Sequence, residues 1–313
     1  MVGTAEGGAE RAVRRWVDAA GGRLVLDGGL ATELEANGAD LNDPLWSAKC
    51  LLSSPHLIRK VHMDYLEAGA NIIITASYQI ALEAREMFLK EHLEKSTPIQ
   101  HPILVAAALG SYGAYLADGS EYSGDYGEAG TKEFLKDFHR RRLQVLAEAG
   151  PDLIAFETIP NKLEAQAYVE LLEECNINIP SWLSFNSKDG VHVVSGDSLI
   201  ECATIADKCA KVGAVGINCT PPRFIHGLIL SIRKVTDKPI LIYPNSGERY
   251  DGEKKEWVES TGVSDGDFVS YVNEWCKDGA ALIGGCCRTT PNTIRAIHRT
   301  LNQGCHKHQL PVA

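Results

Sequence analysis

The sequence predicts an α/β protein built as a (β/α)8 barrel, in which eight parallel strands close on themselves and helices surround them. Two observations indicate this fold: eight short apolar runs recur along the chain, and segments with the start and stop residues of helices lie between them. The main alternative, an open doubly wound sheet, usually carries a G-x-G-x-x-G fingerprint after its first strand when it binds a dinucleotide. The stretch LDGGLATELE at the end of the first run lacks it, so the barrel is favoured.

The predicted strands are apolar almost throughout rather than alternating, as expected of parallel strands that are covered on both faces. They occupy residues 23–29, 70–77, 103–110, 152–158, 181–186, 214–219, 239–245 and 281–287. We therefore expect helices on the outside of the sheet and packed side chains on the inside.

Helical segments separate these runs, and the clearest of them open on residues that cap helices. Ser54 and Pro55 begin one such segment, and Thr131 begins another that ends at Gly150. The helices predicted in this way cover residues 54–70, 131–150, 162–175, 198–213 and 221–235.

One further helix, over residues 9–20, precedes the first strand. Its apolar residues fall on one face, so it is expected to cover the floor of the barrel. No linker divides the chain, and we expect one domain over residues 1–313, with the barrel at about 20–303 and a short tail at each end.

Composition limits the partners of the protein. The formal net charge is −10, which leaves no basic face to attract nucleic acid or an anionic membrane, so small molecules are the expected partners. The sequence shows neither the apolar stretch of an export signal nor an apolar run long enough to span a membrane. Its nine cysteines lack the framework of a small secreted protein, so reduced thiols and a cytoplasmic location are expected.

Thiol side chains stand where two predicted strands end, which is where the chemistry of such barrels collects. Cys219 closes the sixth strand, and Cys286 and Cys287 close the eighth. The carboxyl ends of parallel strands meet at one face of a barrel, so these three thiols are expected to converge on one metal ion. Three thiolates with an open fourth position suit Zn²⁺, which binds sulfur tetrahedrally at about 2.3 Å.

Two other interpretations of these cysteines remain open. A cysteine is often simply a buried apolar residue, and this is our interpretation of the six that lie elsewhere, at positions 50, 175, 202, 209, 276 and 305. Alternatively, Cys286 and Cys287 form a vicinal disulfide, although neighbouring cysteines rarely bridge each other without strain.

Several motifs fall in order between about residue 20 and residue 300. They are LDGGLATELE, GSYGAYLADGSEYSGDYG, FETIPN, GINCTPP, YPNSGE and GGCCRT. In these motifs the chain resembles the homocysteine S-methyltransferase family, and the pairing of GGCC with GINC is highly specific. The match looks closest to the short, stand-alone members that use S-methylmethionine as methyl donor. The extended arm of the betaine-using relatives and the folate and cobalamin modules of methionine synthase are missing, so those donors are disfavoured.

The resemblance implies an enzyme that transfers a methyl group to the thiol of homocysteine and gives methionine. It implies that Cys219, Cys286 and Cys287 bind Zn²⁺ and that the substrate sulfur supplies the fourth ligand. The chemistry of the residues agrees, because a free thiol is mostly protonated at neutral pH and coordination to zinc deprotonates it.

The resemblance also implies a binding site for the amino-acid part of homocysteine. Glu157 with Asp27 is expected to hold the ammonium group, and backbone N–H groups near Gly28 and around Thr75 are expected to receive the carboxylate. Two further residues are carried over as substrate contacts, Tyr78 and Asn245. From the residues alone, Glu157 has one alternative role, which is to pair with an arginine of a neighbouring helix.

A long, acidic, tyrosine-rich loop over residues 117–130 follows the third strand. Long loops in compact domains tend to be functional. We hypothesise that aromatic rings and carboxylates in and near this loop accept the positive sulfonium of the methyl donor. The candidates are Tyr112, Tyr115, Tyr122, Asp125 and Tyr126.

Other functions are compatible with parts of this pattern. A barrel metallohydrolase would need harder ligands than three thiolates, and a structural zinc site would need a fourth cysteine or histidine, which is not obvious here. The sequence does not rank S-methylmethionine against S-adenosylmethionine as donor, nor homocysteine against selenocysteine as acceptor. Oligomeric state is equally undetermined.

Overall fold

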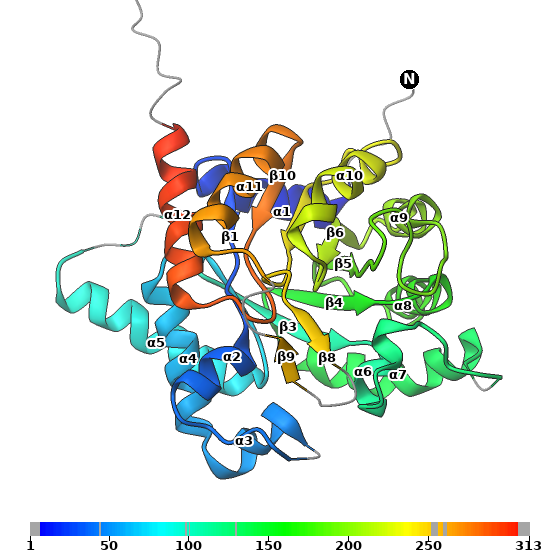
Figure 1. Cartoon of the computed structure of the whole chain (residues 1–313), viewed down its shortest axis with the longest axis horizontal. Coiled ribbons are helices and arrows are strands. Elements are labelled where there is room, and N and C mark those ends of the chain that lie inside the picture. The colour runs from blue at the N-terminus through cyan, green and yellow to red at the C-terminus, as the bar shows by residue number, and fades with distance from the viewer. Residues whose placement is uncertain are drawn as a thin grey trace, which may run out of the picture.

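A computed structural model describes residues 7–43, 45–97, 99, 101–128, 130–251, 256–258 and 262–305. Eight strands in this part form one parallel sheet in the spatial order β1-β10-β7-β6-β5-β4-β3-β2. A parallel bridge between Leu26 and Ile72 joins the two end strands, so the sheet closes into a barrel that helices surround (Figure 1). The predicted (β/α)8 fold is confirmed. The strands are β1 (Leu24–Val25), β2 (Ile72–Ile74), β3 (Leu104–Gly110), β4 (Leu153–Ile159), β5 (Ser181–Phe185), β6 (Val212–Asn218), β7 (Ile240–Tyr243) and β10 (Ala280–Ile283).

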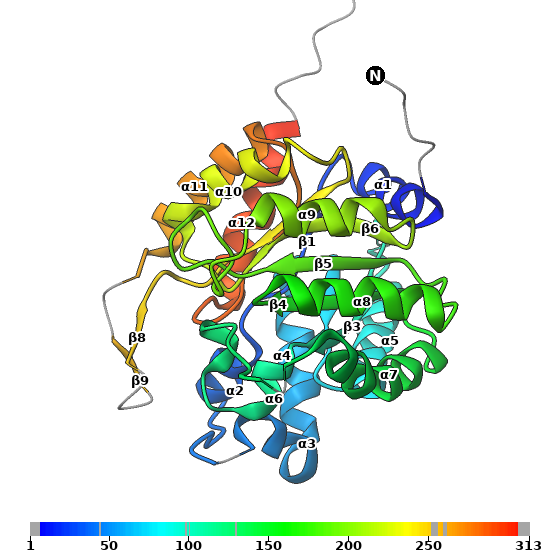
Figure 2. The same cartoon turned by 90° about the vertical axis from the view of Figure 1, so that its right-hand side faces the viewer.

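Helices fill the segments between the strands. The longer ones are α1 (Gly8–Ala19), α4 (Pro55–Glu67), α5 (Tyr78–Glu94), α7 (Lys132–Glu148), α8 (Lys162–Glu174), α9 (Leu199–Lys208), α10 (Pro222–Ile232), α11 (Asp265–Lys277) and α12 (Pro291–Cys305). Shorter pieces are α2 (Leu30–Ala36), α3 (Lys49–Ser53), α6 (Tyr112–Leu116) and the 3₁₀ turns η1 (Trp46–Ala48) and η2 (Ser120–Tyr122). A hairpin of β8 (Arg249–Asp251) and β9 (Glu256–Val258), which the sequence did not predict, stands away from the barrel (Figure 2).

Side-chain caps explain where several helices begin. The Thr131 hydroxyl accepts a hydrogen bond from the Phe134 N–H at 3.2 Å, and it fixes the start of α7 as predicted. Ser54 is the N-cap residue of α4, but its side chain makes no capping hydrogen bond, so Pro55 supplies the start signal there.

Helix α1 covers the floor of the barrel, as predicted. Its residues Val13 and Val17 are buried and pack against side chains of the barrel interior such as Leu241. The helix lies directly on β6 because Gly213 has no side chain, since a Cβ there would come within 2.7 Å of the Ala9 carbonyl oxygen. The opposite end of the barrel, where the strands finish, is left for the candidate site.

Among the described residues, no helix combines the length and the apolar character needed to cross a bilayer.

His62 is a buried histidine without a compensating partner. It lies on α4, and neither of its ring nitrogens has a hydrogen-bond partner among the described residues. Burial lowers the pKa of His62 to about 4. The unfolded chain, whose histidine pKa lies near 6.5, therefore binds this proton more readily than the folded protein does. The free energy of unfolding is therefore unaffected by this histidine above about pH 6.5, and it decreases as the pH falls from there through about 4.

The parent protein should lose free energy of unfolding between about pH 7 and about pH 4. We predict that His62→Leu makes this loss smaller by about 3 kcal/mol, because each unit of pKa shift corresponds to about 1.36 kcal/mol. Urea unfolding at about pH 7 and about pH 4 measures this difference in the free energy of unfolding. The exposed His56 on the same helix gives the matched control His56→Leu, which should keep the acid sensitivity of the parent protein. Equal acid losses in the two variants would contradict the prediction.

Candidate metal centre and substrate site

Three cysteine sulfur atoms meet at the carboxyl end of the barrel. Cys219 follows β6, while Cys286 and Cys287 follow β10. The Sγ atom of Cys287 lies 3.8 Å from that of Cys219 and 3.9 Å from that of Cys286, and all three lie within 4.8 Å of one another. All three thiols are free, and their separations exclude a vicinal disulfide, whose sulfurs would be about 2.05 Å apart.

The strand between them holds both cysteine segments in place. The Cys219 N–H donates to the Tyr243 carbonyl at 3.2 Å, and the Cys286 N–H donates to the Pro244 carbonyl at 2.8 Å. Cys219 itself has a φ of 48°, in the left-handed region that a residue with a side chain seldom adopts. Such strain persists only where surrounding contacts impose it, and it is concentrated at functional sites.

The spacing of the sulfurs fits a tetrahedral metal ion. Zn–S bonds of about 2.3 Å at tetrahedral angles separate the sulfur atoms by about 3.8 Å, which agrees with the two short separations. Within the part of the chain that is described, no histidine, aspartate or glutamate joins the three cysteines as a further ligand. The donor set therefore suits a soft ion with one coordination position left for another molecule.

Electrostatics concentrate negative charge on one of the thiols. Hydrogen bonds from Cys219 and Cys286, together with the neighbouring Arg288 guanidinium, lower the pKa of Cys287. Hydrogen bonding to the other two thiols, together with burial, raises the pKa of Cys286. Without a cation the cluster thus favours a single thiolate, since three buried negative charges would repel one another.

Two carboxylates lie beside the cysteines, that of Asp27 buried and that of Glu157 partly buried. Asp27 is 4% exposed, and its Oδ2 accepts the Ile74 N–H at 2.8 Å. Glu157 accepts a hydrogen bond from the Tyr243 hydroxyl at 3.2 Å. Burial raises the pKa of both acids, that of Glu157 to about 7, and the charge of Glu157 adds to the rise for Asp27. Two desolvated acids that repel each other form a site that a positive group would stabilise.

The alternative role of Glu157, an ion pair with a helix arginine, does not occur. Among the described residues no lysine or arginine lies within ion-pair distance of its carboxylate. Its partner Tyr243 is instead fixed by the Ser184 hydroxyl at 2.5 Å and by the Trp182 indole N–H at 3.2 Å. Side chains inside the barrel therefore orient the Glu157 carboxylate through Tyr243.

The other residues expected to contact substrate lie in different settings. Gly28 lies where a Cβ would come within 2.8 Å of the Tyr65 ring, so no larger residue fits. Asn245 follows β7 and is buried, and its Oδ1 accepts the Gly247 N–H at 2.9 Å. Both lie in segments that border the cysteines.

The structure does not bring the expected polar groups of Thr75 and Tyr78 to the cysteines. The Thr75 N–H donates to the Ala106 carbonyl and its hydroxyl accepts the Ala108 N–H, so β3 uses both groups. The Tyr78 hydroxyl donates to the Gly150 carbonyl at 2.9 Å, beyond the carboxyl end of α7. The expected contact between Tyr78 and the substrate stays a prediction.

The tyrosine-rich loop divides its residues between two surroundings. The Tyr122 hydroxyl hydrogen-bonds to the Cys219 sulfur, while its ring remains 42% exposed at the edge of the site. The Asp125 carboxylate is exposed and accepts the N–H of Gly127, two residues further on. The Tyr126 hydroxyl points away from the cysteines, into a buried network. Only Tyr122 of the three loop candidates therefore reaches the cysteine cluster.

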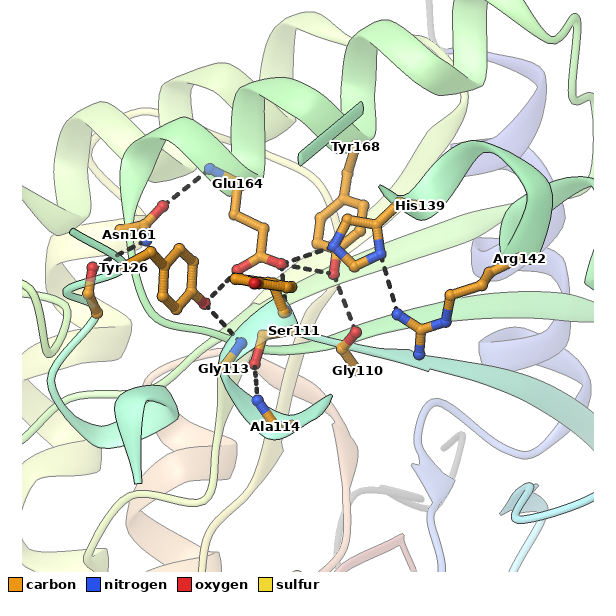
Figure 3. A network of polar contacts seen from close by, with 12 residues as sticks. Gly110, Ser111, Gly113, Ala114, Tyr126, His139, Arg142, Asn161, Glu164 and Tyr168 are labelled. Carbon is orange, nitrogen blue, oxygen red and sulfur yellow. Dashed lines mark hydrogen bonds and ion pairs between the residues drawn. The ribbon is translucent and has the colours of Figure 1, made fainter. Parts of the chain in front are cut away.

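That network is centred on Glu164 of α8, which is fully buried (Figure 3). Its carboxylate accepts hydrogen bonds from the Tyr126 hydroxyl at 2.7 Å and from the Tyr112 N–H at 2.6 Å. The Tyr168 hydroxyl and the His139 ring complete its set of donors. One carboxylate of α8 thus holds both ends of the loop that carries Tyr122.

The protonation of His139 follows from its neighbours. Arg142 can only donate, and it lies 3.2 Å from Nδ1 of His139, so that nitrogen carries the lone pair (Figure 3). The proton is therefore on Nε2, which donates to Glu164 at 2.7 Å. Burial lowers the pKa of His139, in agreement with a neutral ring.

Several residues that border the site were given no role in the sequence analysis. Asn218 accepts the Thr158 N–H and donates to the Thr158 hydroxyl, and it thereby joins the ends of β4 and β6. Glu121 and Asn186 border the cysteines from the tyrosine-rich loop and from the end of β5. The places of Asn218 and Asn186 at strand ends were visible in the sequence, whereas Glu121 lies in η2, and the partners of all three side chains depend on the packing of the loops.

A (β/α)8 barrel that gathers three thiols and two buried acids at the carboxyl end of its strands has the site of an enzyme for small molecules with a thiol and a positive group. The chain belongs to the homocysteine S-methyltransferase family, whose model matches residues 24–301. The family predicted from the motifs is confirmed.

Individual relatives are similar over nearly the whole chain. Homocysteine S-methyltransferase 3 of Zea mays is 93% identical over an alignment of 338 residues that covers 100% of both chains. Selenocysteine Se-methyltransferase of Brassica oleracea var. italica is 64% identical over 90% of this chain and 89% of its own. The crystal structure of the homocysteine methyltransferase MmuM from Escherichia coli in its metallated form superimposes with a TM-score of 0.76 at 38% identity, covering 88% of this chain and 96% of that one.

The alignment with the Zea mays protein is longer than the chain. It spans 338 positions against 313 residues, so at least 25 of its positions have no counterpart here. At 93% identity over the whole alignment, nearly all of the 313 residues of this chain are identical to their aligned partners. The two sequences therefore differ mainly by residues that are missing, while the three cysteines and both buried acids are present here.

We predict that Glu164→Gln lowers the free energy of unfolding by about 2–4 kcal/mol. The amide N–H₂ would replace an oxygen that accepts hydrogen bonds, and it would then meet other donors. It should also speed hydrogen exchange of the segment around Tyr122 without changing the metal content, which mass spectrometry measures. The matched control is Glu170→Gln on the same helix, which breaks only half-exposed pairs with Lys132 and Lys136 and should cost less than about 1 kcal/mol. Equal exchange in both variants would contradict the role of the network.

Proposed function

We propose that this protein is a zinc-dependent methyltransferase that moves a methyl group from S-methylmethionine, or from S-adenosylmethionine, to the thiol of homocysteine and so forms methionine. The observation that carries the proposal is the convergence of Cys219, Cys286 and Cys287 with spacings suited to Zn²⁺. Membership of the homocysteine S-methyltransferase family supports it. The cytoplasm, where thiols stay reduced, is the compartment in which we expect it to act.

In this proposal the three cysteines hold the metal. When bound, zinc supplies a Lewis acid that lowers the pKa of a thiol ligand, so a substrate thiol is presented as the nucleophilic thiolate. The thiolate sulfur attacks the methyl carbon of the sulfonium, and the electron pair of the breaking C–S bond stays on the donor sulfur. The thiol proton passes to solvent. After the transfer, the former sulfonium and the methylated acceptor are both neutral thioethers.

The two buried acids supply the other half of the substrate site. We propose that Asp27 and Glu157 receive the ammonium group of homocysteine, since both are desolvated and lack a cationic partner in the described part of the chain. A positive group between them would stabilise their ionised forms, which burial disfavours. Backbone groups near Gly28 and the side chain of Asn245 remain our candidates for the substrate carboxylate.

Selenocysteine is a second candidate acceptor. The observation that favours it is the 64% identity to selenocysteine Se-methyltransferase of Brassica oleracea var. italica. A selenol is a soft nucleophile that the same ligand set suits. The metallohydrolase alternative is disfavoured because three thiolates suit water activation poorly, and a purely structural zinc site is disfavoured because the cluster has no fourth ligand among the described residues.

We predict that the purified protein contains one zinc ion and methylates homocysteine with S-methylmethionine, and that Cys219→Ser loses both properties. Removing one of three thiolates leaves too few soft ligands to retain zinc through purification. Metal analysis and a methionine assay with each donor in turn measure the two effects. Cys175→Ser, at the end of α8 and away from the cluster, is the control. A metal-free parent protein with full activity would refute the proposal.

A separate prediction concerns Glu157. Glu157→Gln should raise the KM for homocysteine roughly ten- to hundredfold, since a charge-assisted hydrogen bond contributes about 1.5–3 kcal/mol. The zinc content should stay unchanged. Glu148→Gln, a change at an exposed glutamate on α7, is the control and should leave the KM unaltered. Loss of zinc with no change in KM would show that Glu157 supports the metal and not the amino acid.

A further inference from the structure

Two buried oxygen atoms near the cysteines have no hydrogen-bond donor. They are Oε2 of Glu121 and Oδ1 of Asn186, and no other buried side-chain oxygen in the described part of the chain lacks a partner. The two residues are joined, because the Asn186 amide donates to the Glu121 carbonyl at 2.8 Å. That bond fixes which end of the amide is the nitrogen, so Oδ1 is the free acceptor. Burying an acceptor without a donor is costly, and two adjacent cases call for an explanation.

Both residues border the cysteine cluster. Asn186 directly follows β5 and is 1% exposed, while Glu121 lies in η2 next to Tyr122, whose hydroxyl reaches Cys219. Burial raises the pKa of Glu121, and the charges of Asp118 and Cys287 raise it further. The Glu121 carboxylate is therefore held within electrostatic range of the proposed metal ligands.

The segment carrying Glu121 is packed closely enough to hold this position. Gly113 of α6 approaches it so tightly that a Cβ there would lie 2.5 Å from the Glu121 nitrogen. The Ser120 N–H and hydroxyl both donate to the Asp118 carboxylate, which closes the turn in front of Glu121. The backbone at Glu121 is thus held in place by close packing and by a hydrogen-bonded turn.

These oxygens form a site distinct from the pair of Asp27 and Glu157. The charge of Glu157 acts on Asp27, whereas Glu121 is affected by the charge of Asp118 and shares with Glu157 only the influence of Cys287. The two sites also lie on different strands. Asp27 follows β1 and Glu157 belongs to β4, whereas Asn186 follows β5. One methyl acceptor with one ammonium group occupies the first site, so the second is free for the other substrate.

We propose that Glu121 and Asn186 form the cation subsite for the methyl donor, with the Glu121 carboxylate facing an onium group of that molecule. The inference rests on the proposed function and refines it. Two hydrogen-bond acceptors that lack a donor suit a positively charged group. The sulfonium carries the methyl group to be transferred, so it must lie next to the thiolate cluster. S-methylmethionine offers two positive groups, the sulfonium and the ammonium, and both have the chemistry that this subsite accepts.

The test uses the zinc-loaded full chain and measures binding as well as turnover. Equilibrium dialysis with labelled S-methylmethionine gives the donor Kd without homocysteine, and steady-state kinetics give KM and kcat for each substrate. For Glu121→Gln we expect the donor Kd and KM to rise roughly tenfold or more, while the homocysteine KM changes by less than about twofold. Glu121→Asp keeps the charge and should recover part of the affinity. Glu128→Gln, a change at an exposed glutamate of the same loop, is the matched control.

Further measurements separate the possible outcomes. Zinc content and thermal unfolding show whether a variant is folded, and Asn186→Leu provides an independent loss of the second oxygen. Dimethylsulfoniopropionate, which has a sulfonium but no ammonium, identifies the group that faces Glu121. If Glu121→Gln weakens the binding of both ligands equally, Glu121 faces the sulfonium. If it weakens the binding of S-methylmethionine alone, Glu121 faces the ammonium.

A donor Kd that changes by less than about twofold in folded Glu121→Gln overturns the inference while leaving the proposed function intact. A parent protein that binds the donor but transfers no methyl group overturns the proposed function, and one that binds no donor overturns both the proposed function and the inference.

Discussion

The carboxyl end of β7 is the constraint on which the rest of the site depends. Both cysteine segments hydrogen-bond to it through the main chain, by way of the carbonyls of Tyr243 and Pro244 and the N–H of Ser246, which donates to the Cys287 carbonyl at 3.1 Å. Backbone contacts therefore position both of the segments that carry the sulfurs. Cysteines that follow strand ends in this way are held more precisely than cysteines on free loops. The left-handed backbone of Cys219 is a local cost of that arrangement.

Tyr243 links the thiol cluster to the buried acids. Its carbonyl holds Cys219, and its hydroxyl donates to Glu157, so one residue sets the position of a metal ligand and of the proposed ammonium ligand. An α-amino acid with a thiol at the end of its side chain presents an ammonium and a sulfur at a limited range of separations. A site that fixes both of its contact points selects such molecules by length as well as by charge, since binding energy is lost when either contact is misplaced.

The sequence predicts the placement of strands and strand-end residues better than the direction of individual side chains. The apolar run at 152–158 corresponds to β4 (Leu153–Ile159), and because parallel strands end at one face, the meeting of Cys219 with Cys286 and Cys287 could be expected from the order of the runs. The direction of Tyr78 could not, because its partner Gly150 is 72 residues away. Tyr126 is a similar case, since the carboxylate that binds it belongs to Glu164 on another helix. The hairpin of β8 and β9 lacks the apolar signal of a buried strand.

The tyrosine-rich loop shows how an unsatisfied carboxylate persists in a folded protein. Each buried acceptor without a donor costs about 1–3 kcal/mol, and Glu121 with Asn186 carries two of them. On the opposite side of the loop, Glu164 accepts four hydrogen bonds from fully or partly buried donors and holds the loop to α7 and α8. These hydrogen bonds stabilise the loop in the conformation that buries the Glu121 oxygen. A carboxylate held in this manner is prepared for a cation before the cation arrives, and binding then costs little reorganisation.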